Sequence, residues 1–212
     1  MEDCTSDAQT PRWSILVGDV MERITEVEPE SVQTCITSPP YWGLRDYGHE
    51  DQLGLEATPE EYTEKMVAVF REVRRVLRDD GTLWLNLGDS YANSGSAPPR
   101  PDHSGGDLLG TYGKQAYSSA SKGPSRNTPT GLKPKDLVGI PWRVAFALQA
   151  DGWYLRSDII WAKPNPMPES VTDRPTKSHE YLFLLTKSER YFYDMDAVKE
   201  PATGRAPGNK TH

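Results

Sequence analysis

Cysteine and long apolar runs are both scarce in this chain of 212 residues. The two cysteines, Cys4 and Cys35, lie far apart, and Cys35 sits in an apolar segment, so the sequence indicates neither a disulfide framework nor a metal site. No apolar stretch approaches the roughly 20 residues that a membrane-spanning helix needs. The first ten residues are acidic and polar, unlike a signal peptide. We therefore expect a reducing, cytoplasmic location, with no membrane partner.

Basic residues are outnumbered, and the formal net charge is −7. Taken alone, this value argues against nucleic-acid binding, but the charges are segregated. Residues 1–90 hold 19 acidic and 8 basic side chains, whereas residues 91–135 hold 2 acidic and 6 basic ones. Residues 92–134 are rich in Gly, Ser and Pro with almost no periodic apolar pattern, so we expect a long flexible loop. The positive charges of this loop suit contact with DNA phosphates, although a solubilising insertion would explain any one of them equally well. These charges include Lys114, Lys122, Arg126, Lys133 and Lys135.

The apolar pattern predicts alternating strands and helices in the first half of the chain. Residues 13–17 and 32–37 read as strands around a short helix at 20–27, which is the size of a βαβ unit with a parallel pair. Thr58-Pro59-Glu60-Glu61 is typical of a helix start, and the helix is predicted to continue to Leu77, with Gly81 ending it. Residues 82–87 then read as a third strand.

The second half continues in the same way. Pro141 opens a helix that runs to Ala150 and ends at Gly152. Further strands are predicted at 153–161 and 180–186, with a short one at 191–193, and residues 201–212 read as a disordered tail. His179-Glu180 has no second histidine at helical spacing, so a structural pair at a strand entry is favoured over a metal or acid-base site.

The segment Thr37 to Trp42 reads Thr-Ser-Pro-Pro-Tyr-Trp and directly follows an apolar strand. Two consecutive prolines cannot continue a strand, so the chain must leave the sheet in a stiff, extended turn. We expect this turn to direct the Ser38 hydroxyl and the Ser38 and Pro39 carbonyls outward beside the Tyr41 ring. A planar base with an exocyclic amino group suits such acceptors next to a stacking surface. The alternative is a turn that has only a structural role. A serine-hydrolase site is excluded because no Gly-x-Ser-x-Gly sequence surrounds Ser38.

This segment resembles the signature of the amino-group DNA methyltransferases, which methylate cytosine N4 or adenine N6 using S-adenosylmethionine. Segments 158–165 and 178–187 resemble the family's paired strands, and together the matches cover most of residues 13–196. The resemblance implies an α/β fold: a partial Rossmann-like sheet, mostly parallel, with an antiparallel pair near the C-terminal end and helices on its faces. It also implies double-stranded DNA as a partner and a prokaryotic or phage-type intracellular protein.

The resemblance also implies roles for individual residues. Ser38, Pro39, Pro40 and Tyr41 would be catalytic: Ser38 and the Pro39 carbonyl accept the amino hydrogens, and Tyr41 stacks on a flipped base. The serine form of the motif favours cytosine N4 over adenine N6. The remaining assignments place Trp42 and Asp89 in the base pocket and Asp19 and Thr37 at the cofactor, although helix capping explains Asp19 nearly as well.

One expected feature is missing: the chain has no aromatic-x-Gly-x-Gly turn for the methionine end of the cofactor. We therefore expect a truncated gene, a split enzyme or a fragment, in which residues 1–200 form the catalytic part. Half a sheet leaves an open edge, so a second chain or a dimer partner is expected to cover or complete it. The alternatives are an inactive DNA-binding or assembly remnant, and an enzyme that methylates RNA or a protein amide.

Overall fold

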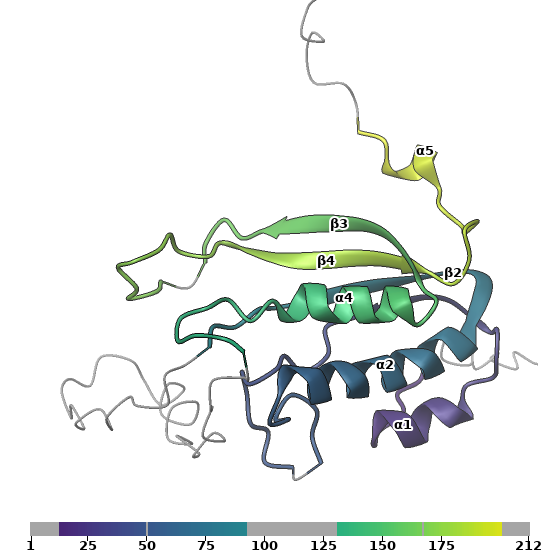
Figure 1. Ribbon diagram of the computed structural model, residues 1–212. Coiled ribbons are helices and arrows are strands. Elements are labelled where there is room, and N and C mark those ends of the chain that lie inside the picture. The colour runs from purple at the N-terminus through teal and green to yellow at the C-terminus, as the bar shows by residue number, and fades with distance from the viewer. Residues whose placement is uncertain (1–12, 50, 93–130, 167, 201–212) are drawn as a thin grey trace, which may run out of the picture.

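The computed structural model describes residues 13–49, 51–92, 131–166 and 168–200. Within these ranges four strands form one mixed sheet in the order β1-β2-β4-β3 (Figure 1). β1 and β2 pair in parallel, whereas β4 pairs antiparallel with both β2 and β3. The strands are β1 (Val32–Thr37), β2 (Leu77–Leu87), β3 (Tyr154–Ala162) and β4 (His179–Thr186). The α/β class and the antiparallel pair near the C-terminal end are confirmed, and the parallel part of the described sheet is a single pair.

Helix α2 (Pro59–Val76) forms where the sequence predicts it. The Thr58 side chain accepts a hydrogen bond from the Glu61 backbone N–H at 3.1 Å, and Pro59 occupies the first helical position. Every third or fourth side chain is buried, including Tyr62, Met66, Phe70 and Val73. This apolar stripe packs α2 onto the sheet.

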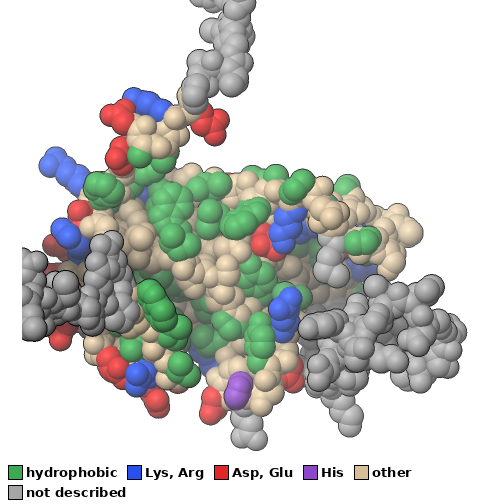
Figure 2. Space-filling view, turned by 180° about the vertical axis from the view of Figure 1, so that it is seen from behind, with side chains coloured by type: hydrophobic (Ala, Val, Ile, Leu, Met, Phe, Trp, Pro, Cys, Tyr) green, Lys and Arg blue, Asp and Glu red, His purple; other side chains and the backbone are tan. Residues whose placement is uncertain are grey.

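Helices α2 and α4 (Ile140–Ala150) cover the same face of the sheet (Figure 1). Alternate side chains of β2 point into this core, and Leu83, Leu85 and Leu87 are fully buried. The side chains between them, Trp84 and Asn86, point to the opposite face. No helix of the described residues covers that face, which Figure 2 shows from behind with hydrophobic side chains along it.

The predicted strand at 13–17 is absent, and so is the βαβ unit expected to contain it. Ile15 and Val17 are 73% and 82% exposed, so an extended segment there has neither a paired neighbour nor a face to bury. The chain instead enters α1 (Val20–Arg23) and a 3-10 turn, η1 (Ile24–Glu26). The parallel pair is built from β1 and β2, with α2 in the connection between them.

Two other element boundaries differ from the prediction. Helix α2 ends at Val76 because Leu77 adopts an extended backbone and begins β2. Gly81 therefore does not end the helix; a Cβ there would lie 2.9 Å from the Arg78 carbonyl oxygen, so glycine allows a close backbone approach. Residues 191–193 form no strand and lead to the short helix α5 (Met195–Val198).

Most of the predicted 92–134 loop and the tail at 201–212 lie outside the described residues. No helix of the described ranges has the length and apolarity needed to cross a bilayer.

Replacing Phe70 by Ala tests the packing of α2. Phe70 is 1% exposed, so we expect the substitution to lower the free energy of unfolding by about 3 to 5 kcal/mol, measured by urea denaturation. Phe146→Ala is the control because Phe146 is 55% exposed, and its cost should stay near or below about 1 kcal/mol. Equal costs at the two positions would contradict the assigned core.

Candidate active site at the end of strand β1

The diproline turn that follows β1 is held by contacts from two directions. The Tyr62 hydroxyl of α2 donates to the Pro40 carbonyl at 2.9 Å. The Gly43 N–H donates to the Gly54 carbonyl at 2.6 Å, and Gly54 approaches so closely that a Cβ there would lie 2.9 Å from the Tyr41 carbonyl oxygen. No hydrogen bond to the Pro39 carbonyl forms within the described part of the chain. These contacts hold the turn in place, and the Pro39 carbonyl has no partner among the residues that the structure describes.

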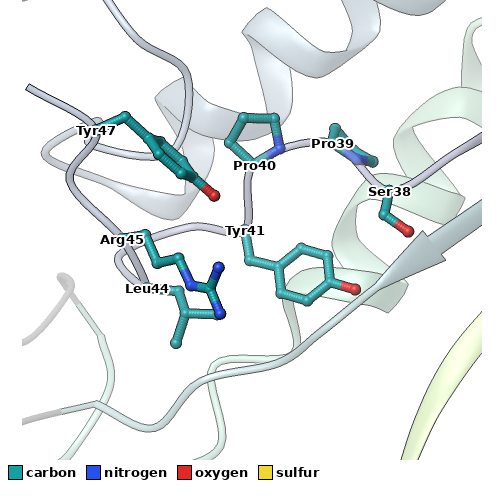
Figure 3. A pocket seen from close by; sticks show the side chains of 7 residues that line it. All are labelled: Ser38, Pro39, Pro40, Tyr41, Leu44, Arg45 and Tyr47. Atoms are coloured by element: carbon teal, nitrogen blue, oxygen red, sulfur yellow. The ribbon is translucent and has the colours of Figure 1, made fainter. Parts of the chain in front are cut away.

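The turn borders an open hollow of about 280 Å³. Ser38 is exposed beside it, and Tyr41 is half-buried. Figure 3 shows the Ser38 and Tyr41 hydroxyl groups on the same side of the turn, with the Arg45 side chain between the Tyr41 and Tyr47 rings in this view. The structure thus brings the four predicted catalytic residues together at a cavity and adds three that were not predicted. The full lining is Ser38, Pro39, Pro40, Tyr41, Leu44, Arg45 and Tyr47.

The Asn86 side chain of β2 accepts hydrogen bonds from both hydroxyl groups of the turn. The strand register pairs Thr37 with Leu85, so the next residues, Ser38 and Asn86, lie side by side. The Ser38 hydroxyl donates to the Asn86 side-chain Oδ1 at 3.1 Å, and the Tyr41 hydroxyl donates to the same oxygen at 2.6 Å. The Ser38 hydroxyl therefore gives its proton to Asn86 rather than pointing freely outward. The sequence signal for Asn86 is a lone amide between Leu85 and Leu87 in an apolar strand.

Glu180 at the start of β4 also reaches the turn. The Tyr41 hydroxyl lies 3.4 Å from Glu180 Oε2, while Glu180 Oε1 forms an ion pair with Lys163 at the end of β3. Burial, and next the negative charge of Glu180, raise the pKa of Tyr41 to about 12. The phenol is therefore protonated at neutral pH. Glu180 was expected to be structural only, and its contact with Tyr41 comes from the pairing of distant strands.

The Tyr41 ring rests on the backbone of Gly88. A Cβ at position 88 would lie 2.7 Å from two atoms of the ring, which is closer than real contacts allow. Glycine directly after β2 therefore lets the ring lie close to the backbone.

Other predicted site residues have structural contacts and do not line the hollow. Trp42 is buried in the core, where its indole N–H donates to the Glu56 carbonyl at 3.0 Å. Asp89 Oδ1 accepts from the N–H groups of Gly139 and Ile140 and so caps α4. Asp19 caps α1 by accepting from the Met21 N–H at 2.8 Å. Thr37 is half-buried as the last residue of β1.

Three buried polar atoms beyond the end of β2 have no hydrogen-bond partner among the described residues: Asp89 Oδ2, Ser90 Oγ and Lys177 Nζ. Burial lowers the pKa of Lys177, although the nearby charges of Asp89 and Glu180 act in the opposite direction.

Two of the five predicted DNA-contacting cations lie in the described ranges. The Lys133 side chain is 85% exposed, and its Nζ lies 3.7 Å from the Asp136 carboxylate. Lys135 is paired with Asp173 at 2.5 Å, so a phosphate would have to compete for its ammonium group. The other three, Lys114, Lys122 and Arg126, lie outside the described residues.

A family model described as DNA methylase matches residues 32–212 of this chain, which include the turn, Asn86 and Glu180. The chain belongs to this DNA methylase family. Within the family it is 52% identical over 203 residues to Type II methyltransferase M.XycI from Xanthomonas campestris pv. cyanopsidis. The match covers 93% of this DNA methylase but only 62% of the relative.

Solved structures show the same fold. The cytosine-N4-specific PvuII DNA methyltransferase superposes with a TM-score of 0.55 at 16% identity, covering 86% of this chain and 51% of that one. TTHA0409 from Thermus thermophilus, solved in complex with S-adenosyl-L-methionine, superposes with a TM-score of 0.51 at 19% identity, covering 85% and 56%. The chain therefore has the Rossmann-like methyltransferase fold over the part that these structures share with it.

Replacing Glu180 by Gln tests the environment of Tyr41. Loss of the negative charge stabilises the phenolate, so we expect the Tyr41 pKa to fall below about 12. It should stay above 10.0, the ordinary value, because burial is the larger cause. Absorbance titration, with Tyr41→Phe to assign the signal, measures this pKa. A raised folded-state pKa stabilises the fold below the unfolded value, and this contribution is lost as pH rises from about 10 to about 12. An unchanged Tyr41 pKa in Glu180→Gln would contradict the contact.

Proposed function

We propose that this DNA methylase transfers a methyl group from S-adenosylmethionine to the exocyclic amino group of a DNA base flipped out of the duplex. The observation that carries the proposal is the grouping of Ser38, Pro39 and the Tyr41 ring at one hollow. The likeness to M.XycI, a Type II methyltransferase, supports a modification enzyme that protects DNA against a restriction enzyme. Such an enzyme would act in the cytoplasm, where its DNA substrate lies.

The described residues fit the methyl-bearing end of the cofactor. When bound, S-adenosylmethionine supplies an electrophilic methyl group on a positively charged sulfonium. The hollow offers Pro39, the Ser38 hydroxyl oxygen and the Tyr41 ring, which suit the amine that receives the methyl group, and Arg45 adds one positive charge to the lining. The cocrystal of TTHA0409 with this cofactor supports the same choice. Asp19 and Thr37 remain proposed cofactor contacts.

The residues of the turn prepare the amine for attack. Ser38 and the Pro39 carbonyl accept its two hydrogens, which turns the nitrogen lone pair out of conjugation with the ring. The same oxygens stabilise the positive charge that develops on nitrogen, because they are already oriented before the reaction. Tyr41 holds the base by stacking on it. Lys133 and Lys135, and beyond the described ranges Lys114, Lys122 and Arg126, are the proposed phosphate contacts.

We favour cytosine N4 over adenine N6 as the target. The serine form of the diproline motif supports this choice, and so does the fold shared with the cytosine-N4-specific PvuII enzyme. Trp42 and Asp89 act from behind the proposed base pocket: Trp42 supports the turn from the core, and Asp89 fixes the start of α4.

We also propose that a further polypeptide segment, in this or another chain, binds the methionine end of the cofactor. Two observations support it: the absence of an aromatic-x-Gly-x-Gly turn, and the open face on which Ile36 is 77% exposed. The 62% coverage of M.XycI is in keeping with this idea.

Transfer of a labelled methyl group tests the function. We expect label in DNA, and not in RNA or protein, when the 212-residue chain is incubated with labelled S-adenosylmethionine, alone or with the remaining segment of a relative supplied in trans. Nucleoside analysis of the product should show N4-methylcytosine. Ser38→Ala should lose most of the transfer. Labelling of RNA or protein instead, or none with any supplied segment, would refute the proposal.

Replacing Tyr41 by Ala tests base capture. We expect affinity for substrate DNA to fall by the stacking contribution of one base, about 1 to 3 kcal/mol, with cofactor affinity little changed. Tyr41→Phe keeps the ring and should lose much less. Tyr193→Ala, which removes an exposed tyrosine beyond the far end of β4, is the matched control. Binding by Tyr41→Ala as tight as by the parent chain would exclude stacking as the role of Tyr41.

A further inference from the structure

We propose that Asn86 sets the direction of the hydrogen bonds offered by Ser38 and Tyr41, and so selects a base with an amino group over one with a carbonyl at that position. The inference rests on the proposed function of the hollow as a base site and adds its selectivity. It makes Asn86 a positioning residue, because it acts through the two hydroxyl groups.

The orientation of the Asn86 amide is set by a backbone carbonyl. Asn86 is 7% exposed, and its Nδ2 donates to the Tyr181 carbonyl at 3.0 Å. A carbonyl oxygen cannot donate, so the amide cannot turn over without bringing two acceptors together. The position of Tyr181 is in turn fixed by strand pairing, since Asn86 lies opposite Leu182. The Asn86 Oδ1 oxygen must therefore face the diproline turn.

That oxygen accepts both hydroxyl protons. Ser38 donates at 3.1 Å and Tyr41 at 2.6 Å, and each hydroxyl has only one proton to give. The second neighbour of the Tyr41 hydroxyl, Glu180 Oε2 at 3.4 Å, is also an acceptor, so the phenol proton stays within the protein in either case. These two hydroxyl groups therefore present only oxygen lone pairs toward the hollow, which Pro39 also lines. The donors in the lining belong to Arg45 and Tyr47.

The acceptors on Ser38 and Tyr41 match an amino group. The amino group of cytosine or adenine offers two N–H donors, whereas the carbonyl of thymine, uracil or guanine would place lone pairs against lone pairs. A polar group left unpaired in this way weakens binding on the order of tenfold or more.

The test uses two free nucleosides of nearly the same shape. Deoxycytidine has an amino group at the position where deoxyuridine has a carbonyl, and their affinities for the 212-residue chain are measured by NMR titration without DNA or cofactor. We expect deoxycytidine to bind about tenfold or more tightly. In Asn86→Leu the Ser38 hydroxyl can turn outward and donate, while Glu180 still accepts the Tyr41 proton, so deoxyuridine should gain affinity and the ratio should fall toward one.

Each other outcome overturns the proposal. If Asn86 were merely structural, Asn86→Leu would weaken both nucleosides equally and leave the ratio unchanged. Equal binding of the two nucleosides by the parent chain would also refute it. Should Asn86→Leu fail to fold, Ser38→Ala replaces it: the loss of an acceptor lowers deoxycytidine affinity alone, whereas equal losses for both nucleosides contradict the assigned direction. Because no methyl transfer is measured, failure of the proposed enzyme activity would be seen separately.

Discussion

The hydrogen bonds that converge on Asn86 Oδ1 are the constraint on which the site depends. They join three segments that are distant in the sequence: the turn after β1, the end of β2 and, through the Tyr181 carbonyl, the start of β4. The diproline makes the turn stiff, but stiffness alone does not decide where the Ser38 and Tyr41 side chains point. The hydrogen bonds to Asn86 fix these directions, and the parallel register of β1 and β2 places Asn86 next to Ser38.

The sheet thus acts as the frame of the site in two ways. Its one face buries leucines beneath α2 and α4, which fixes the strand positions, and its other face presents Asn86 at the carboxyl end of β2. Gly88 continues this face and lets the Tyr41 ring lie against the backbone. Glu180, paired with Lys163, reaches the same ring from β4. An error of one residue in register would turn Asn86 into the core and leave both hydroxyl groups without their acceptor.

Local signals made much of this arrangement predictable from the sequence. The diproline turn and the start of helix α2 are determined by local residues, Pro39-Pro40 and Thr58-Pro59, so both were predicted correctly. Asn86 and Glu180 were missed as site residues because strand pairing brings them to Tyr41 across 45 and 139 positions of sequence. Trp42 shows a further limit of prediction from the sequence. Adjacent aromatic residues leave a turn in different directions, and composition does not tell that Tyr41 faces the hollow while Trp42 enters the core.

Acceptor atoms facing an open hollow carry little cost before a ligand arrives, because water donates to them freely. An amine then replaces two water protons by two of its own, so hydrogen bonds are exchanged rather than lost, and the gain comes from stacking and from orientation. A carbonyl cannot make this exchange. The hydroxyl groups cannot rotate to meet it without giving up Asn86, and Asn86 cannot turn without giving up the Tyr181 carbonyl. Selectivity in this site is therefore a consequence of sheet geometry, since the Tyr181 carbonyl that orients the Asn86 amide belongs to the backbone of β4.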